Sequence, residues 1–239
     1  MHSSFTETWF HTSVPEGARS IVLPDEEARH ATKVLRLKPG TEIVIATGEG
    51  SVYKAALKDD RGAAEILGLM RRDPEPPGWA LGLPLLRGRD TELPAEGACE
   101  FALGDIFLLV TDHSSEFKGQ DFTKLVERLR QKSVVALKQA KKSWLTRIHA
   151  PQDLRAWRAA HAPIPLLVAH PGDDETPAPL PVALHLLTGP EGGFSVKELE
   201  WLFSGDGAGA KRLPLGPTRL RAIHAPVAAL GSLTGRSGK

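Results

Sequence analysis

The chain has 239 residues, of which 41% are hydrophobic and 25% are charged, and its net charge is +1. This balance is typical of a soluble globular protein with one large domain or two smaller ones. The single cysteine, Cys99, excludes an intrachain disulfide and a cysteine-based metal site, and we expect no bound metal. The N-terminus lacks the features of a signal peptide, and the longest apolar run, 106–110, is far too short to span a bilayer. We therefore expect a cytoplasmic protein without a membrane partner.

The N-terminal part reads as a series of short strands. Residues 43–50 (IVIATGEG) and 51–59 (SVYKAALKD) predict a hairpin with a glycine turn, and residues 63–72 fit another strand or a short helix. The Pro- and Gly-rich segment 71–84 is the predicted linker to a second domain. Residues 1–72 are thus expected to form a small barrel, a common format for an RNA-binding module.

Strands and helices alternate after this segment. Residues 104–112 predict a strand, and residues 121–144 predict a long helix because apolar residues recur at three- and four-residue steps. Three further strands are expected, each ending in a loop with adjacent Gly and Pro: 163–172, 182–193 and 211–217. The alternation predicts a mostly parallel α/β sheet in a second domain, 78–239. In such a sheet the ligand lies beyond the carboxyl ends of the strands, where these loops collect.

Charge is unevenly distributed in this second part of the chain. Residues 124–147 contain eight lysines and arginines against one acid, Glu127, and residues 211–239 contain six basic residues and no acid. Such segregation leaves a basic surface, which is typical of a protein that contacts a phosphate backbone. A solvated helix face would explain the first cluster equally well.

The loop in residues 186–200 (LLTGPEGGFSVKELE) combines a glycine cluster with a helix start. Gly192 and Gly193 permit positive φ and the close approach of a ligand. Ser195 and Glu198 form a capping-box pattern, so a helix should begin near Val196 and direct free N–H groups toward the loop. The stretch matches neither a Walker motif nor the dinucleotide fingerprint. Taken alone, the sequence of this loop favours a plain turn and a ligand-binding loop equally.

A second Gly-Pro loop lies in residues 215–222 (LGPTRLRA) and carries Arg219 and Arg221. These side chains belong either to a C-terminal helix with solvated arginines or to the wall of a pocket. Together with a Pro-Gly loop at 171–172, the loops would expose main-chain donors and acceptors at one end of the sheet. Such a pocket suits an adenine ring with a polar tail.

GPEGGFS followed by LGPxxLR resembles the SPOUT methyltransferases, and specifically the RsmE family, which methylates N3 of a uridine in small-subunit ribosomal RNA. Residues 29–57 resemble the family's PUA-like β-barrel, residues 101–115 its ELGV-containing strand, and residues 136–148 its basic helix. The resemblance implies an α/β fold with a trefoil-knotted SPOUT methyltransferase domain behind a smaller PUA-like barrel. It further implies S-adenosylmethionine as cofactor, ribosomal RNA or the small subunit as partner, and a homodimer.

The resemblance also implies site residues. Cofactor contacts are expected from three loops: Ala169, His170, Gly172, Leu187, Thr188, Gly189, Glu191, Gly192, Gly193, Leu215, Gly216 and Leu220. RNA contacts are expected from basic residues of the barrel and the helix: Arg29, Lys33, Arg36, Lys138, Lys141 and Lys142.

Two departures from the family pattern concern the chemistry. LRTETA is replaced by LRAIHA in residues 220–225, and ELGV by ALGD in residues 102–105. Arg221 is the expected cation for the charge that develops on the uracil oxygens, and a salt bridge or a phosphate contact is its alternative. His224 would take the N3 proton if it faces the pocket. The departures keep two rivals open: a protein that binds RNA without turnover, and a methyltransferase that modifies another nucleotide.

Overall fold

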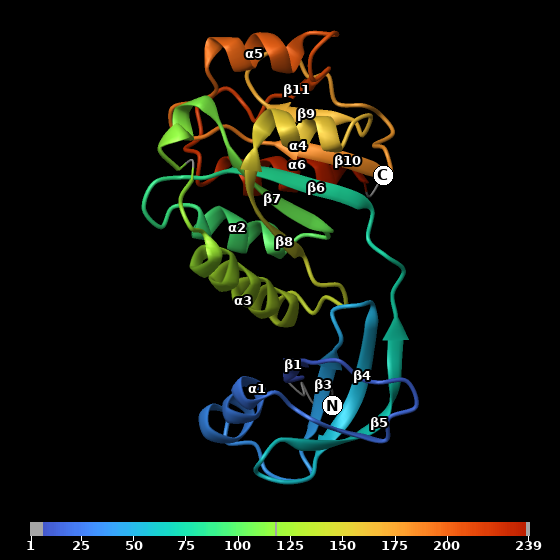
Figure 1. Ribbon diagram of the computed structural model, residues 1–239. Helices are drawn as coiled ribbons and strands as arrows, with labels where there is room; N and C mark the ends of the chain where they lie inside the picture. The colour runs from blue at the N-terminus through green and yellow to red at the C-terminus, as the bar shows by residue number, and fades with distance from the viewer. Residues whose placement is uncertain (1–6, 118, 238–239) are drawn as a thin grey trace. The chain divides into compact units, whose positions relative to one another are not determined.

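The computed structural model describes residues 7–117 and 119–237, which divide into two compact units. The first unit contains the described residues up to Glu75 together with Val134–Leu145, and the second contains Pro76–Ser133 and the residues from Thr146 onward. Figure 1 shows both units, coloured along the chain. The segment 134–145, which the sequence analysis assigned to the second domain, thus groups with the first unit.

The first unit is built on a five-stranded sheet in the order β1-β3-β4-β5-β2. Its elements are β1 (Trp9–His11), β2 (Ser20–Val22), α1 (Asp25–Arg29), a π-helical turn (His30–Val34), β3 (Glu42–Ala46), β4 (Ser51–Leu57) and β5 (Ala63–Arg72). The predicted hairpin is confirmed, because β3 and β4 pair antiparallel. The segment 63–72 is a strand, not a helix. Phe10, Ile43 and Ile45 lie fully buried in the core of this unit.

The predicted linker 71–84 was wrong at both ends. Arg72 ends β5, and Gly78–Pro84 form β6, a buried strand, so that only residues 73–77 connect the two strands. Gly82 looks like a loop glycine in the sequence, but it is required for packing. A Cβ at this position would lie 2.9 Å from Cδ1 of Leu109 and 3.1 Å from the ring of Trp157.

The long helix ends earlier than predicted. The helix α3 spans Thr123–Gln139, and Lys141 then adopts a φ of 53°. Trp144 was expected on the helix but forms an isolated bridge with Gly48, and its indole N–H donates to the carbonyl of Asp73 over 3.2 Å. The Trp144 side chain therefore packs within the first unit and leaves the helical path.

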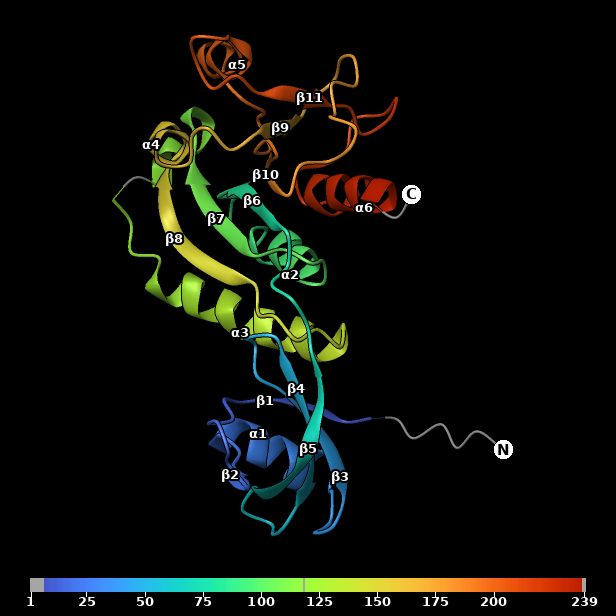
Figure 2. The same cartoon turned by 90° about the vertical axis from the view of Figure 1, so that its right-hand side faces the viewer.

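The second unit is built on a six-stranded, wholly parallel sheet in the order β11-β9-β10-β6-β7-β8, which confirms the predicted parallel α/β architecture. Besides β6 and α3, its elements are α2 (Glu92–Cys99), β7 (Asp105–Val110), a 3-10 segment η2 (Asp112–Phe117), β8 (Arg147–Asp153), α4 (Leu154–Ala160), β9 (Leu166–Ala169), β10 (Ala183–Leu187), α5 (Val196–Phe203), β11 (Lys211–Leu213) and α6 (Ala225–Ser237). In Figure 2 the helices α2 and α6 run beside each other, and they are in contact.

Several local predictions in this unit are confirmed. The three strands with Gly and Pro loops are β9, β10 and β11, and α5 begins at Val196 behind a complete capping box of Ser195 and Glu198. Trp157, on α4, is the largest of the fully buried side chains among the described residues. Among the described helices, none is long and apolar enough to cross a membrane.

Candidate functional site

A cavity of about 780 Å³ lies in the second unit, where the loops that follow β9, β10 and β11 meet. The parallel order of these strands brings their carboxyl ends to one edge of the sheet, which is the expected place for a ligand. The cavity is lined by Asp90, Ala169, His170, Pro171, Gly189, Pro190, Glu191, Gly193, Phe194, Leu199, Leu215, Gly216, Pro217, Thr218, Arg219, Leu220, Arg221, Ala222, Ile223 and Ala225.

Most of the predicted cofactor residues line this cavity. They come from all three loops and are Ala169, His170, Gly189, Glu191, Gly193, Leu215, Gly216 and Leu220. The other four lie nearby but do not line it. Leu187 and Thr188 are fully buried at the end of β10, Gly192 faces the His113 ring, and Gly172 packs against the side chain of Arg212.

The two predicted catalytic residues separate in the structure. Arg221 is exposed and lines the cavity. His224 does not line the cavity; it lies on a shallow groove formed by α2 and the start of α6, with Leu93 and Val227. The structure therefore does not bring His224 into the pocket, and its expected role as proton acceptor is not supported. One turn of chain at 221–225, held by backbone hydrogen bonds to the carbonyl of Arg221, sends the two side chains to different places.

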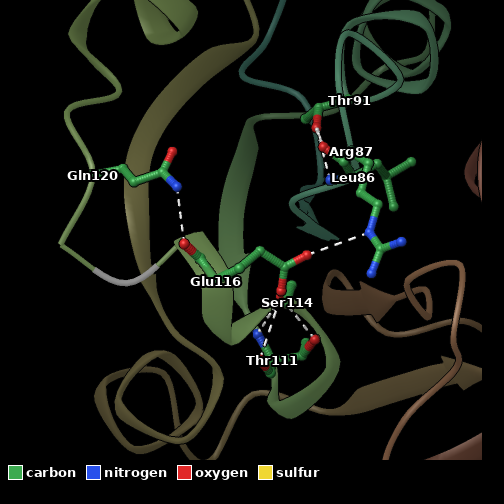
Figure 3. Close-up of polar contacts among 7 residues, drawn as sticks. All are labelled: Leu86, Arg87, Thr91, Thr111, Ser114, Glu116 and Gln120. Atoms are coloured by element: carbon green, nitrogen blue, oxygen red, sulfur yellow. Dashed lines mark hydrogen bonds and ion pairs between the residues drawn. The ribbon is translucent and has the colours of Figure 1, made fainter.

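A fourth loop of the site was not predicted from the sequence. Asp90 lines the cavity from the loop between β6 and α2. Thr91 fixes this loop, because its hydroxyl accepts a hydrogen bond from the backbone N–H of Leu86 over 2.8 Å (Figure 3). An apolar run ends just before RGRD in the sequence, but the two glycines and the proline of β6 made this strand look like a linker.

The glycine-rich loop after β10 has the backbone that its sequence predicts. Gly193 has a φ of 72°, and its N–H donates to the carbonyl of Pro190 over 2.9 Å, closing a turn. Gly189 lies against the ring of Phe194, which a Cβ would approach to 3.4 Å. The N-terminus of α5 follows this turn directly, with Ser195 as its cap. At Gly189 and Gly193 the turn thus carries no side chain that could cover its main-chain groups.

The loop after β9 is tied to β11 and α6 by ion pairs. The Arg236 guanidinium donates to the carboxylate of Asp174 over 2.8 Å and, with Thr176, lowers the pKa of Asp174 to about 2. The backbone N–H of Arg212 donates to Glu175 over 3.0 Å and lowers the pKa of that carboxyl. These contacts fix a loop whose first residues, His170 and Pro171, line the cavity.

The charges around the cavity are few and mixed. Arg219 and Arg221 have exposed side chains without an ion-pair partner among the described residues, and Asp90 and Glu191 are the acids of the lining. In the part of the chain that the structure describes, no cluster of His, Cys, Asp or Glu could hold a metal ion. The cavity thus combines main-chain donors and acceptors, apolar walls and two cations, a set that suits a heterocycle with a charged tail.

Asp105 replaces the last residue of the expected ELGV. It contacts two side chains of the neighbouring strand β8, Arg147 and His149. The Arg147 guanidinium donates to both of its carboxylate oxygens, over 2.8 and 2.7 Å, and Nε2 of His149 lies 2.6 Å away. Burial raises the pKa of Asp105, but these hydrogen bonds outweigh it and hold the pKa well below its usual range. Asp105 therefore joins β7 to β8 and does not line the cavity.

The predicted RNA-binding residues all lie in the first unit, in two environments. Arg29, Lys33 and Arg36 are exposed and make no ion pair within the described residues. Lys138 instead pairs with the buried Glu27 over 2.5 Å, and its side chain is only 19% exposed. Lys141 pairs with Glu7 over 3.6 Å, and Lys142 is half-buried.

Comparisons with known proteins agree with this geometry. A family model described as an RNA methyltransferase domain matches residues 74–234, and one described as an RNA methyltransferase PUA domain matches residues 23–67. The ribosomal RNA small subunit methyltransferase E of Synechocystis is 25% identical over 97% of this chain and 78% of its own. The enzyme of the same name from Mycobacterium tuberculosis is 28% identical over 92% and 88%.

Two solved structures share the fold over nearly the whole chain. The ribosomal RNA small subunit methyltransferase E of Neisseria gonorrhoeae, bound to S-adenosylmethionine, has a TM-score of 0.79 at 22% identity and covers 96% of this chain and 97% of its own. A Legionella pneumophila protein solved with the same cofactor has a TM-score of 0.82 at 22% identity, with the same coverage.

Proposed function

Because the chain belongs to the RNA methyltransferase domain family and carries its PUA domain, we propose that it transfers a methyl group from S-adenosylmethionine to N3 of a uridine in 16S ribosomal RNA. The observation that carries this proposal is the cavity at the carboxyl ends of β9, β10 and β11. Relatives that carry the name ribosomal RNA small subunit methyltransferase E, one of them solved with this cofactor, support the reaction and the substrate.

The cavity fits the cofactor in size and chemistry. Its volume of about 780 Å³ lies within the usual range for small-molecule sites. Gly189, Gly193 and Gly216 leave main-chain groups open to an adenine and a carboxylate, and Leu199 and Leu215 provide apolar walls. We assign cofactor binding to the eight predicted residues that line the cavity, joined by Pro190, Phe194 and Pro217.

The reaction needs positioning and charge stabilisation more than acid–base chemistry. The bound cofactor supplies an electrophilic methyl group. The three loops hold the reactants in line, which converts an encounter in solution into a reaction within one complex. Arg221 stabilises the negative charge that develops on the uracil oxygens as N3 loses its proton. That proton leaves to water or to one of the two lining carboxylates, Asp90 and Glu191.

The RNA is held mainly by the first unit in this proposal. Its match to the PUA domain and the exposed, unpaired cations Arg29, Lys33 and Arg36 support this assignment. Such cations contact phosphates and orient the RNA without reading its sequence. Lys138 is a weaker candidate because its ammonium group already pairs with Glu27.

The proposal includes a trefoil knot, a homodimer and a cytoplasmic location. The strand order β11-β9-β10 supports the knot, because the chain has to cross β9 between β10 and β11. Leu93 and Val227, exposed on the groove between α2 and α6, support an apolar contact with a second copy. The ribosomal substrate supports the location. Light scattering of the purified protein tests the homodimer directly.

Transfer of labelled methyl groups tests the reaction. The purified protein is incubated with labelled S-adenosylmethionine and small ribosomal subunits from cells that lack this modification, and the label is mapped by nuclease digestion and mass spectrometry. We expect label at N3 of one uridine. Label on another nucleotide would support the rival methyltransferase, and cofactor binding without transfer would support the rival that only binds RNA. Failure to bind the cofactor in calorimetry would contradict both enzymatic readings.

A further inference from the structure

The turn that follows β7 forms hydrogen bonds with the glycine-rich loop, and its residues do not line the cavity. Nδ1 of His113 lies 2.9 Å from the carbonyl oxygen of Gly193. The hydroxyl of Ser195 donates to Oδ2 of Asp112 over 2.5 Å. Neither His113 nor Asp112 lines the cavity, whereas Gly193 does. The two residues therefore contact the loop on the side that faces away from the ligand.

A buried carboxylate adds a third connection. Oε1 of Glu198 accepts the backbone N–H of Asp112 over 2.9 Å, and Oε2 accepts the backbone N–H of Ser195 over 2.9 Å. Glu198 is only 3% exposed. One side chain thus joins the turn after β7 to the cap of α5, which follows the loop.

The turn that supplies these contacts is itself fixed. Thr111 and Ser114, both buried, flank Asp112 and His113, and their hydroxyl groups lie 2.9 Å apart (Figure 3). The hydroxyl of Ser114 also accepts the backbone N–H of Thr111 over 2.8 Å. A turn closed by buried hydrogen bonds holds its central residues in one conformation, so His113 is presented to the loop in a set position.

The glycine at position 192 lets the loop pack closely on the ring. A Cβ on Gly192 would lie 3.2 Å from Nδ1 of His113 and 3.5 Å from its Cβ, so the loop packs directly on the imidazole. Because the Gly193 carbonyl can only accept, the imidazole has to carry a proton on Nδ1. Both the neutral tautomer with that proton and the imidazolium satisfy this requirement.

We propose that His113 is a positioning residue that holds the loop 189–195 in its ligand-binding conformation and thereby sets the affinity for the cofactor without touching it. The inference rests on the proposed function. A glycine-rich loop has many conformations in the absence of a constraint, and ordering it on binding costs affinity. The hydrogen bond to Gly193 removes that cost before the ligand arrives.

Calorimetric titration with S-adenosylmethionine tests the proposal on four proteins: wild type, His113→Ala, His113→Asn and Glu116→Ala. We expect His113→Ala to raise the Kd about three- to tenfold, the range of one net hydrogen bond. His113→Asn should restore the affinity, since its amide N–H₂ occupies the place of Nδ1. Glu116→Ala is the matched control, because Glu116 lies on the same segment and its carboxylate pairs, among the described residues, with the exposed Arg87 alone (Figure 3).

Steady-state kinetics separates positioning from a general structural role. His113→Ala should raise KM for the cofactor while leaving kcat at saturating cofactor unchanged. Wild-type affinity in His113→Ala, or a His113→Asn protein as weak as His113→Ala, would overturn the proposal.

Failure of the proposed function gives a different result, because then the wild-type protein does not bind the cofactor. Amide hydrogen exchange in the cofactor-free protein tests independently whether His113 holds the loop 189–195. Exchange at 192–195 should be faster in His113→Ala than in Glu116→Ala, and equal rates would overturn the inference.

Discussion

Gly193 combines a left-handed backbone with open space around its Cα. Its φ is 72°, and a Cβ there would meet no atom within 4 Å, so replacement by alanine introduces backbone strain and no clash. We expect Gly193→Ala to lower the free energy of unfolding of the second unit by about 1 kcal/mol. Gly231, in the middle of α6, also has open space but a helical backbone, so Gly231→Ala should raise it by about 0.5–1 kcal/mol. Urea denaturation measures both, and shifts of the same sign would contradict the argument.

Arg221 is the cation that the proposed reaction requires. Removal of a charge that acts on the transition state lowers kcat more than it weakens substrate binding. We expect Arg221→Ala to lower kcat about 100-fold, while the Kd for S-adenosylmethionine changes less than threefold. His224→Ala is the control, since this side chain lies outside the cavity, and its kcat should equal that of wild type. A loss of kcat in His224→Ala equal to that in Arg221→Ala would contradict the assignment.

At the scale of elements, β10 and α4 enclose a histidine that is buried in its neutral form. His185 is 3% exposed, its ring stacks on Trp157 at 5.1 Å, and its Nδ1 has no hydrogen-bond partner within the described residues. Burial, followed by the nearby His161 and Arg158, lowers the pKa of His185 to about 4 from the usual 6.5.

This depressed pKa predicts a loss of stability in acid. Between pH 6.5 and 4 the unfolded chain binds a proton at His185 that the folded protein does not, so stability falls as the pH is lowered. The difference amounts to about 3 kcal/mol by pH 4 and is absent above pH 6.5. His185→Phe keeps the aromatic stack and should flatten the pH dependence in urea denaturation. His30→Gln, at an exposed histidine of the first unit, should leave the dependence as in wild type. An unchanged slope in His185→Phe would contradict the assignment.

The elements that the sequence predicted well are those whose signals are local. The capping box of Ser195 and Glu198 and the apolar runs before the Gly and Pro loops specify their own structure, so α5 and β9–β11 were found. The end of α3 and the strand β6 were missed because packing decides them. Trp144 leaves the helical path to cover the first unit, and Gly82 is small because Leu109 and Trp157 fill the space around it.

The same distinction holds for the site. Loops at the carboxyl ends of parallel strands converge by topology, so most of the lining could be named from the sequence. The side to which His224 points depends on how α6 packs on α2, which no local pattern records. Asp90 and His113 come from segments whose sequence carries no ligand motif. The folded sheet brings Asp90 to the cavity and His113 into contact with Gly193.

At the scale of the whole molecule, the near-neutral net charge does not show that the cations have two different roles. Arg29, Lys33 and Arg36 are exposed and without ion-pair partners in the described chain, whereas Lys138 neutralises the buried Glu27. The first three cations are available to bind phosphates, whereas Lys138 stabilises the folded protein. A count of basic residues along the sequence cannot separate these roles, because burial and pairing decide them.

The salt dependence of RNA binding measures this division. Each phosphate contact adds about 0.7 to the slope of log Kd against log salt for single-stranded RNA, so the triple variant Arg29→Ala/Lys33→Ala/Arg36→Ala should reduce the slope by about 2. Lys138→Ala should leave the slope unchanged but lower the free energy of unfolding by roughly 3 kcal/mol, because it leaves the buried Glu27 carboxylate without its cation. Fluorescence anisotropy with a ribosomal RNA fragment at several salt concentrations provides the slopes. If Lys138→Ala reduced the slope and the triple variant did not, the RNA would contact Lys138 and not the exposed cations Arg29, Lys33 and Arg36.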